Sequence, residues 1–113
     1  MSYEGVMRLA REHPYRPSGD FTPDWLLVVR GCYEETKGHE GKIFDGSSVV
    51  DRLRWLPGFE NRTFRCFPGL RLLQKKYGIL KKVGRTVQGG RKANWVMPDI
   101  DGTAKALREL GYL

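Results

Sequence analysis

Apolar residues recur with the period of an α-helix in five stretches of the chain. In the clearest stretch they recur at i, i+3, i+4 and i+7, a spacing that places four residues on one buried helix face: Trp25, Val28, Val29 and Cys32. The same pattern predicts a helix over each of five residue ranges: 3–12, 23–37, 48–56, 67–77 and 101–110. About half of the chain is therefore predicted to be helical.

Short polar residues and glycines mark the boundaries of these helices. Thr22, Ser48 and Asp101 are the expected N-caps, because their side-chain oxygens can accept hydrogen bonds from the first free N–H groups of a helix. A glycine follows three of the helices, where a left-handed residue commonly ends a helix: Gly38, Gly78 and Gly111. The segment His39–Gly46 is expected to be a polar connector.

After Gly78 the pattern changes from a helical period toward the period of a strand. Ile79–Val87 is rich in β-branched residues, and Ala93–Met97 contains a second apolar run. Between them, Gly89–Gly90 supplies the positive φ angles that a tight hairpin needs. Three hairpin residues are expected to complete the core: Val83, Trp95 and Met97. The predicted fold class is therefore α+β, mainly helical with one antiparallel β-hairpin.

The length and composition indicate one globular domain. The chain has 113 residues, of which 40% are hydrophobic and 29% are charged, which is neither a disordered nor a membrane composition. The longest apolar run, Trp25–Val29, is far shorter than the roughly 18 residues that a membrane-spanning helix needs. The first 13 residues include acidic side chains and no continuous apolar stretch, so we expect no secretory signal.

The positive charge is concentrated in the second half of the chain. Lys and Arg number 20 against 13 Asp and Glu, a formal net charge of +7. Between Phe59 and Lys92, Glu60 is the only acidic residue among many basic ones. A face that is merely solvated usually alternates acidic and basic residues, and this segment does not. The charge therefore favours a polyanionic partner, with nucleic acid first.

The passage from the fourth predicted helix into the hairpin resembles a known family. Leu70-Arg71-Leu72-Leu73-Gln74-Lys75-Lys76-Tyr77-Gly78-Ile79-Leu80 is similar to the same passage in winged helix-turn-helix DNA-binding domains, where a helix continues through a glycine into the first strand of the wing. The resemblance covers about residues 23–110. It implies a winged helix domain over 21–113, preceded by a helix and loop extension over 1–20.

The resemblance also implies which residues contact DNA. The helix at 67–77 lies in the major groove, with Leu70, Leu73 and Tyr77 as its buried back. Its front can read base edges, since Arg pairs well with guanine and Gln with adenine, while the basic hairpin meets the phosphate backbone or the minor groove. The expected DNA-binding residues are Arg62, Arg65, Arg71, Gln74, Lys75, Lys81, Lys82, Arg85, Arg91 and Lys92.

No pattern in the sequence indicates catalysis. His13 and His39 are isolated, and the two cysteines, Cys32 and Cys66, have no further ligands at a metal-binding spacing. No Ser–His–Asp or paired-carboxylate arrangement is present. We therefore expect a non-enzyme with no catalytic residues, no metal site and no cofactor, in which Cys32 is a reduced and buried small hydrophobic residue.

The leading prediction is a DNA-binding transcriptional regulator, acting on double-stranded DNA. Its expected location is the cytoplasm, with association to the nucleoid in a prokaryote, and it is expected to contact no membrane. Small regulators of this kind often act as dimers, so a homodimer joined through residues 1–20 or through the helix at 23–37 is a further expectation. Two alternatives remain open: a winged helix module that docks a protein, and an RNA-binding or ribosome-associated protein.

Overall fold

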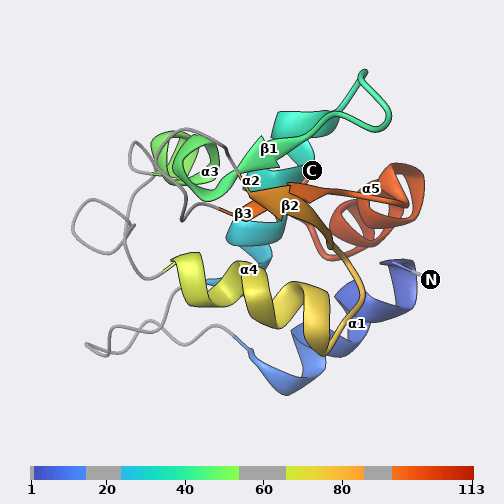
Figure 1. The fold of residues 1–113 in the computed structure, drawn as a ribbon. Helices are drawn as coiled ribbons and strands as arrows, with labels where there is room; N and C mark the ends of the chain where they lie inside the picture. The colour runs from blue at the N-terminus through green and yellow to red at the C-terminus, as the bar shows by residue number, and fades with distance from the viewer. Residues whose placement is uncertain (1, 15–23, 54–65, 86–92) are drawn as a thin grey trace.

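The computed structural model describes residues 2–14, 24–53, 66–85 and 93–113 of the chain (Figure 1). These residues form an α+β fold of helices around a small antiparallel sheet, so the predicted coarse class is confirmed. The elements follow in the order α1 (Ser2–Glu12), α2 (Trp25–Thr36), β1 (Phe44–Asp45), α3 (Gly46–Leu53), α4 (Cys66–Lys75), β2 (Lys81–Arg85), β3 (Ala93–Val96) and α5 (Ile100–Glu109).

The sheet has the strand order β1-β3-β2, with β3 in the centre and both pairings antiparallel. Strands β2 and β3 form the predicted hairpin, whose expected tip at Gly89–Gly90 lies outside the described residues. Trp95 pairs with Phe44 of β1 on one side and with Lys82 of β2 on the other. The first strand was not predicted, because Phe44–Asp45 falls within the segment expected to be a polar connector.

An irregularity in the pairing of β2 with β3 leaves one predicted core residue exposed to solvent. The pairing shifts between Lys82 and Gly84, so Val83 is the extra residue of a β-bulge. The side chain of Val83 lies 42% exposed, and the prediction that it packs in the core is wrong. Trp95 and Met97 are buried as predicted.

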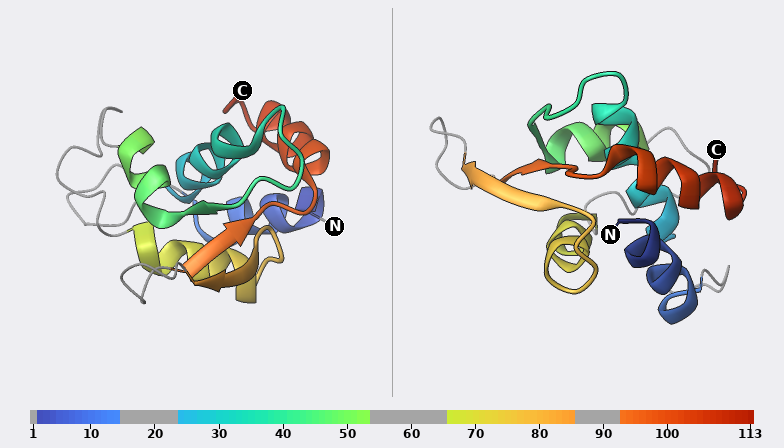
Figure 2. Two further views of the ribbon diagram at one scale, coloured as in Figure 1. Left: turned by 45° about the horizontal axis from the view of Figure 1, so that its top comes forward. Right: turned by 90° about the vertical axis from the view of Figure 1, so that its right-hand side faces the viewer.

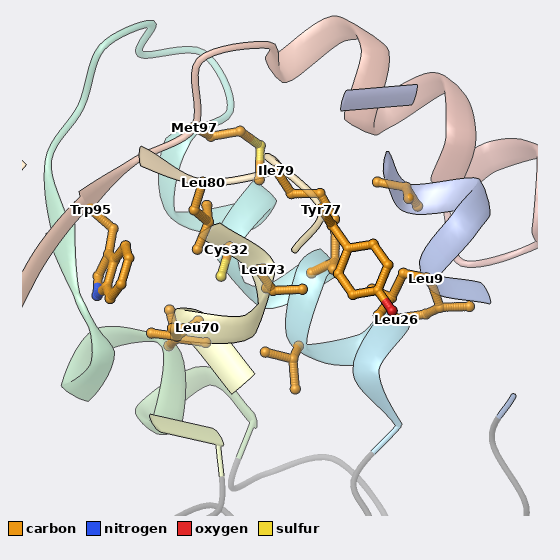
Figure 3. Packing of buried hydrophobic residues seen from close by; sticks show 14 of the residues in the cluster. Leu9, Leu26, Cys32, Leu70, Leu73, Tyr77, Ile79, Leu80, Trp95 and Met97 are labelled. Atoms are coloured by element: carbon orange, nitrogen blue, oxygen red, sulfur yellow. The ribbon is translucent and has the colours of Figure 1, made fainter. Parts of the chain in front are cut away.

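One hydrophobic core joins the helices to the sheet. Figure 3 shows side chains of this core, which come from α1, α2, α4 and the strands or the residues beside them. Val6 and Leu9 bring α1 into the same core as Leu107 of α5. The predicted boundary at residue 20 lies outside the described residues. Figure 2 shows α1 and α5 lying together, away from the end of β2.

Aspartates cap α2 and α5, at positions other than those predicted. Asp24, and not Thr22, is the N-cap of α2, and its carboxylate accepts a hydrogen bond from the backbone N–H of Leu26 at 3.1 Å. Asp99, and not Asp101, caps α5 by accepting a hydrogen bond from the backbone N–H three residues later at 3.0 Å. Both predicted caps lie two residues from the actual one.

The start of α3 also differs from the prediction. The carboxylate of Asp45 accepts hydrogen bonds from the backbone N–H of Ser48 at 3.0 Å and from its hydroxyl at 3.4 Å. Ser48 is therefore a donor inside the first turn and not the N-cap, and α3 begins at Gly46. The predicted end of this helix, beyond Leu53, lies outside the described residues.

The glycines after the helices take the left-handed conformation that was predicted for them. Gly38, Gly78 and Gly111 have φ angles of 78°, 64° and 83°. At the end of α5 the backbone N–H of Tyr112 donates to the carbonyl of Leu107 at 2.8 Å, which closes the last turn across Gly111. At Gly78 the chain turns from α4 toward β2.

Candidate nucleic-acid interface

Helix α4 has a buried apolar back and an exposed basic front, as the sequence predicted. Leu70 and Leu73 are almost completely buried, and Tyr77, just beyond the helix, is 6% exposed. Arg71 and Lys75 stand one turn apart, and both are exposed. Gln74 lies beside them and is half-buried. One guanidinium group and one ammonium group are thus presented to solvent by a helix whose position the core fixes.

These cations are not neutralised by carboxylates of the described part of the chain. Within residues 2–14, 24–53, 66–85 and 93–113, Arg71 and Lys75 form no ion pair, and neither do Lys81 and Lys82 of β2. The adjacent residue Lys76 differs, because its ammonium group lies 3.0 Å from a carboxylate oxygen of Glu12. Unpaired cations leave a positive field that attracts a polyanion.

The side chains of the two lysines at the start of β2 lie on opposite faces of the sheet. Lys82 pairs with buried Trp95, whereas Lys81 pairs with half-buried Val96, and successive residues of a strand point to opposite sides. Because β2 is an edge strand, lysines there also oppose edge-to-edge pairing with another sheet. The two lysines therefore do not form a single patch, and a ligand held by both must contact both faces of β2.

Several predicted site residues cannot be placed against this face. Arg62, Arg65, Arg91 and Lys92 lie outside the described residues, and Arg85 is the last residue of β2. Of the predicted site residues, the structure places Arg71, Gln74 and Lys75 together on α4. Lys81 and Lys82 follow on the strand that this helix leads into.

A polar cluster around Glu12 joins the end of α4 to α1. One carboxylate oxygen accepts a hydrogen bond from the Tyr77 hydroxyl at 2.8 Å and lies 3.0 Å from the ammonium group of Lys76. The other accepts a hydrogen bond from Nε of Arg8 at 2.6 Å. These donors, Arg8 first and then Tyr77 and Lys76, lower the pKa of Glu12 to about 2. Burial, followed by the hydrogen bond to Glu12, raises the pKa of Tyr77.

No pattern in the sequence indicates this cluster apart from the spacing of Arg8 and Glu12, which is that of an i,i+4 pair on a helix. The partners from α4 lie more than 60 residues away, since Tyr77 and Glu12 are 65 positions apart. A close backbone contact accompanies the cluster, because a Cβ atom at Gly5 would overlap the carbonyl oxygen of Tyr77. Helix α1 therefore holds the C-terminal end of α4 in place.

In the described ranges there is no group of three or more His, Cys, Asp or Glu residues that could hold a metal ion. None of the helices in those ranges is long and apolar enough to cross a membrane. Cys32 is buried, as predicted.

Comparison of the chain with protein-family models, curated proteins and solved structures found no match in any of the three. Function is therefore inferred from the fold and from the geometry of α4 and the hairpin.

Proposed function

We propose that this chain is a winged helix-turn-helix DNA-binding protein that regulates transcription. In this proposal α4 enters the major groove, and the hairpin of β2 and β3 contacts the phosphate backbone or the minor groove. One observation carries the proposal: the exposed front of α4 bears Arg71 and Lys75, which form no ion pair among the described residues. The same helix leads through Gly78 into a strand with two further lysines that are likewise unpaired within those residues.

The shape of α4 suits duplex DNA. A helix with its side chains is about 10–12 Å wide, and the major groove of B-form DNA is about 12 Å wide. Arg71 can donate two hydrogen bonds to guanine, and Gln74 can both donate to and accept from adenine. The order of helices followed by a basic antiparallel hairpin also agrees with what the winged helix resemblance implies.

The alternative functions fit this face less well. A protein-docking helix is expected to expose large apolar residues, and between Leu70 and Lys75 of α4 the structure describes no large exposed apolar side chain. An RNA helix has a deep and narrow major groove that does not admit an α-helix. A basic helix face that is exposed to solvent therefore favours double-stranded DNA.

A binding competition tests the proposal. A labelled duplex that has been selected for binding from a random pool is titrated with the protein at two salt concentrations, with unlabelled duplex DNA or structured RNA as the competitor. We expect duplex DNA to compete better than RNA and binding to weaken as salt rises. The double variant Arg71→Ala/Lys75→Ala should bind about tenfold or more weakly, since each lost contact to DNA contributes about 1 kcal/mol or more.

The matched control is Lys37→Ala/Lys42→Ala, which also removes two positive charges but from the opposite half of the sequence, where both lysines lie near glutamates. Its affinity for DNA should stay close to that of the unchanged protein. The proposal is overturned if the control loses as much affinity as the α4 variant, if RNA competes better, or if the protein binds neither nucleic acid.

A further inference from the structure

A groove of about 770 Å³ lies along α1, beside the end of α5. Three residues of α1 and one residue beyond α5 supply its apolar lining: Tyr3, Met7, Ala10 and Leu110. The residues from α1 follow one another at i, i+4 and i+7, so they form a continuous apolar stripe along one helix face. All four are only partly buried, although they pack against the core from outside. None of the described lining residues belongs to α4 or β2.

Contacts to α5 fix one wall of this groove. The hydroxyl of Tyr3 donates a hydrogen bond to the carboxylate of Glu109, and the ammonium group of Lys105 lies 5.1 Å from the centre of the Tyr3 ring. The apolar stripe is thus held in place before any partner binds, which lowers the entropy cost of binding.

A row of charged residues follows the apolar stripe along α1. Glu4, Arg8 and Arg11 also line the groove, and all three are exposed. Each of them comes one position after a residue of the stripe. Because successive residues of a helix lie about 100° apart around its axis, this charged row borders the stripe on one side. Two positive charges therefore lie toward the C-terminal end of α1, and one negative charge lies near its N-terminal end.

The side chains of the charged row have donors and acceptors left for a partner. Glu4 and Arg11 form no ion pair within the described residues. Arg8 donates a hydrogen bond from Nε to Glu12, and its guanidinium group lies 5.5 Å from the centre of the Tyr77 ring. Its two terminal nitrogens form no hydrogen bond within the described residues. Part of the charge of Arg8 is balanced by Glu12, so Arg11 supplies the larger share of the attraction for an anion.

The order of these charges sets the direction of a helix that would fill the groove. Such a helix needs acidic side chains near Arg8 and Arg11 and a basic side chain near Glu4. The helix dipole favours acidic residues at the N-terminal end of a helix and basic residues at its C-terminal end. A helix with this common distribution fits antiparallel to α1, with its apolar face on the stripe.

A second copy of α1 fits the groove less well. If two copies crossed antiparallel at Met7, in the middle of the stripe, each Arg8 would lie beside the crossing point and face the Arg8 of the other copy. Like charges that face each other across an interface oppose association. The charged row therefore favours a helix of different sequence.

We propose that this groove docks an amphipathic helix of a partner protein, antiparallel to α1, with acidic residues beside Arg8 and Arg11 and a basic residue beside Glu4. Apolar side chains of the partner cover the stripe, and the small side chain of Ala10 leaves room for a large one. A single docked helix buries a small area, so we expect a dissociation constant in roughly the micromolar range. This docking does not depend on DNA binding.

Two synthetic peptides of about 15–20 residues test the proposal by fluorescence anisotropy. Both carry leucines at helical spacing on one face. The acid-first peptide has glutamates beside this face near its N-terminus and lysines near its C-terminus, and the base-first peptide has these glutamates and lysines exchanged. We expect the acid-first peptide to bind in roughly the micromolar range and the base-first peptide to bind about tenfold more weakly.

Exchanging the charges of the groove should remove this preference. Glu4→Arg/Arg11→Glu keeps the net charge of the chain and leaves the pair between Arg8 and Glu12 intact. It should change the ratio of the two affinities by about tenfold or more, so that the base-first peptide binds at least as well as the acid-first peptide. Neither misfolding nor a difference in helix content between the peptides would produce tighter binding of the base-first peptide.

A matched control makes the same two charge changes elsewhere. Glu40→Arg/Arg108→Glu alters exposed residues that do not line the groove, so it should keep the preference for the acid-first peptide. Met7→Gln tests the apolar stripe separately. It should weaken both peptides alike by about fivefold, because it removes an apolar contact and leaves the charged row unchanged. A circular dichroism spectrum checks that this variant is folded.

Three outcomes overturn the proposal. In the first, the two peptides bind equally well, as they would to any exposed apolar surface. In the second, Glu4→Arg/Arg11→Glu changes the ratio of the affinities no more than the control does. In the third, neither peptide binds, and sedimentation equilibrium then shows whether a second copy of the chain fills the groove.

Discussion

At the scale of single residues, Glu12 links two helices whose relative position matters for the proposed site. Its carboxylate accepts hydrogen bonds from Arg8 of its own helix and from Tyr77 at the end of α4, and it also pairs with Lys76. An exposed ion pair alone contributes little to stability. Here three donors converge on one carboxylate beside a close backbone contact at Gly5, so the cluster holds α1 against the end of α4.

The lowered pKa of Glu12 predicts a loss of stability in acid. The pKa falls from its ordinary value of 4.5 to about 2 in the folded chain, so the folded state favours the ionised carboxylate. Its stabilising contribution is complete above about pH 4.5 and is lost as the pH falls toward 2. Replacing Glu12→Gln should therefore remove part of the pH dependence of stability in this window.

Urea unfolding midpoints measured from pH 7 to pH 2 check this expectation. The difference between the unchanged protein and Glu12→Gln should narrow as the pH falls from about 4.5 toward 2. Glu40→Gln serves as the control, because Glu40 is exposed and no pairing partner is described for it. Parallel curves for the unchanged protein and Glu12→Gln over the whole range would contradict the assigned role of Glu12.

At the scale of elements, tertiary contacts select the N-caps among several suitable residues. Asp24 accepts a hydrogen bond from the Tyr112 hydroxyl at 2.7 Å in addition to capping α2. Asp99 accepts one from the backbone N–H of Ser2 at 3.3 Å in addition to capping α5. Thr22 and Asp101 have equally suitable side chains, but sequence spacing does not reveal which candidate meets a partner from the other end of the chain.

The cap of α5 gives a prediction with an internal control. Asp99→Ala removes the cap and the contact to Ser2, and should lower the free energy of unfolding by about 1–2 kcal/mol. Asp101→Ala removes only a favourable charge in the first turn and should lower it by about 0.5 kcal/mol. Chemical denaturation of both variants measures the two values. A larger loss for Asp101→Ala would mean that the cap is assigned to the wrong residue.

The sequence predicted the helices and the hairpin because their signals are local. Apolar periodicity marked the buried sides of α2 and α4, and the change of period after Gly78 marked β2. Strand β1 could not be found in this way, since two residues have no period and the pairing of Phe44 with Trp95 joins distant parts of the chain. The bulge at Val83 was not predicted for a similar reason, because a single extra residue does not change the composition of a strand.

One part of the candidate site could likewise be predicted from local sequence patterns, and another part could not. The exposed positions of Arg71 and Lys75 follow from the helical period and from the burial of Leu70 and Leu73, so sequence alone could place them. The anchoring of α4 by Glu12 depends on two helices meeting in space, and no local pattern indicates it.

At the scale of the whole molecule, the cations near α2 and α3 pair with glutamates, whereas the cations at the proposed DNA-binding face do not pair with described carboxylates. Glu35 is nearly buried and pairs with Arg52 at 2.7 Å and with Lys42 at 4.0 Å, and Glu34 pairs with Lys37 at 2.7 Å. These cations are neutralised within the fold. The cations at the front of α4 and at the start of β2 have no such partner among the described residues, so their positive charges are available to a ligand.

If this charge binds DNA, the helix and the strand should contribute in distinguishable ways. Replacing Lys81→Ala and Lys82→Ala should weaken binding to every duplex alike, because phosphates carry no sequence information. Each lost phosphate contact should also flatten the plot of log affinity against log salt by roughly one unit. Replacing Arg71→Ala or Gln74→Ala should instead lower affinity for a selected duplex by about 1–3 kcal/mol and change binding to random duplex much less.

Titrations of both classes of variant against a selected and a random duplex, at several salt concentrations, separate these effects. The ratio of specific to non-specific affinity should stay constant for the β2 variants and fall for the α4 variants. Lys76→Ala is a useful third variant: its ammonium group is held by Glu12, so it should change the salt dependence less than Lys81→Ala. If all variants shifted both duplexes equally, α4 would be acting only as a phosphate-binding surface and would not read the sequence in the major groove.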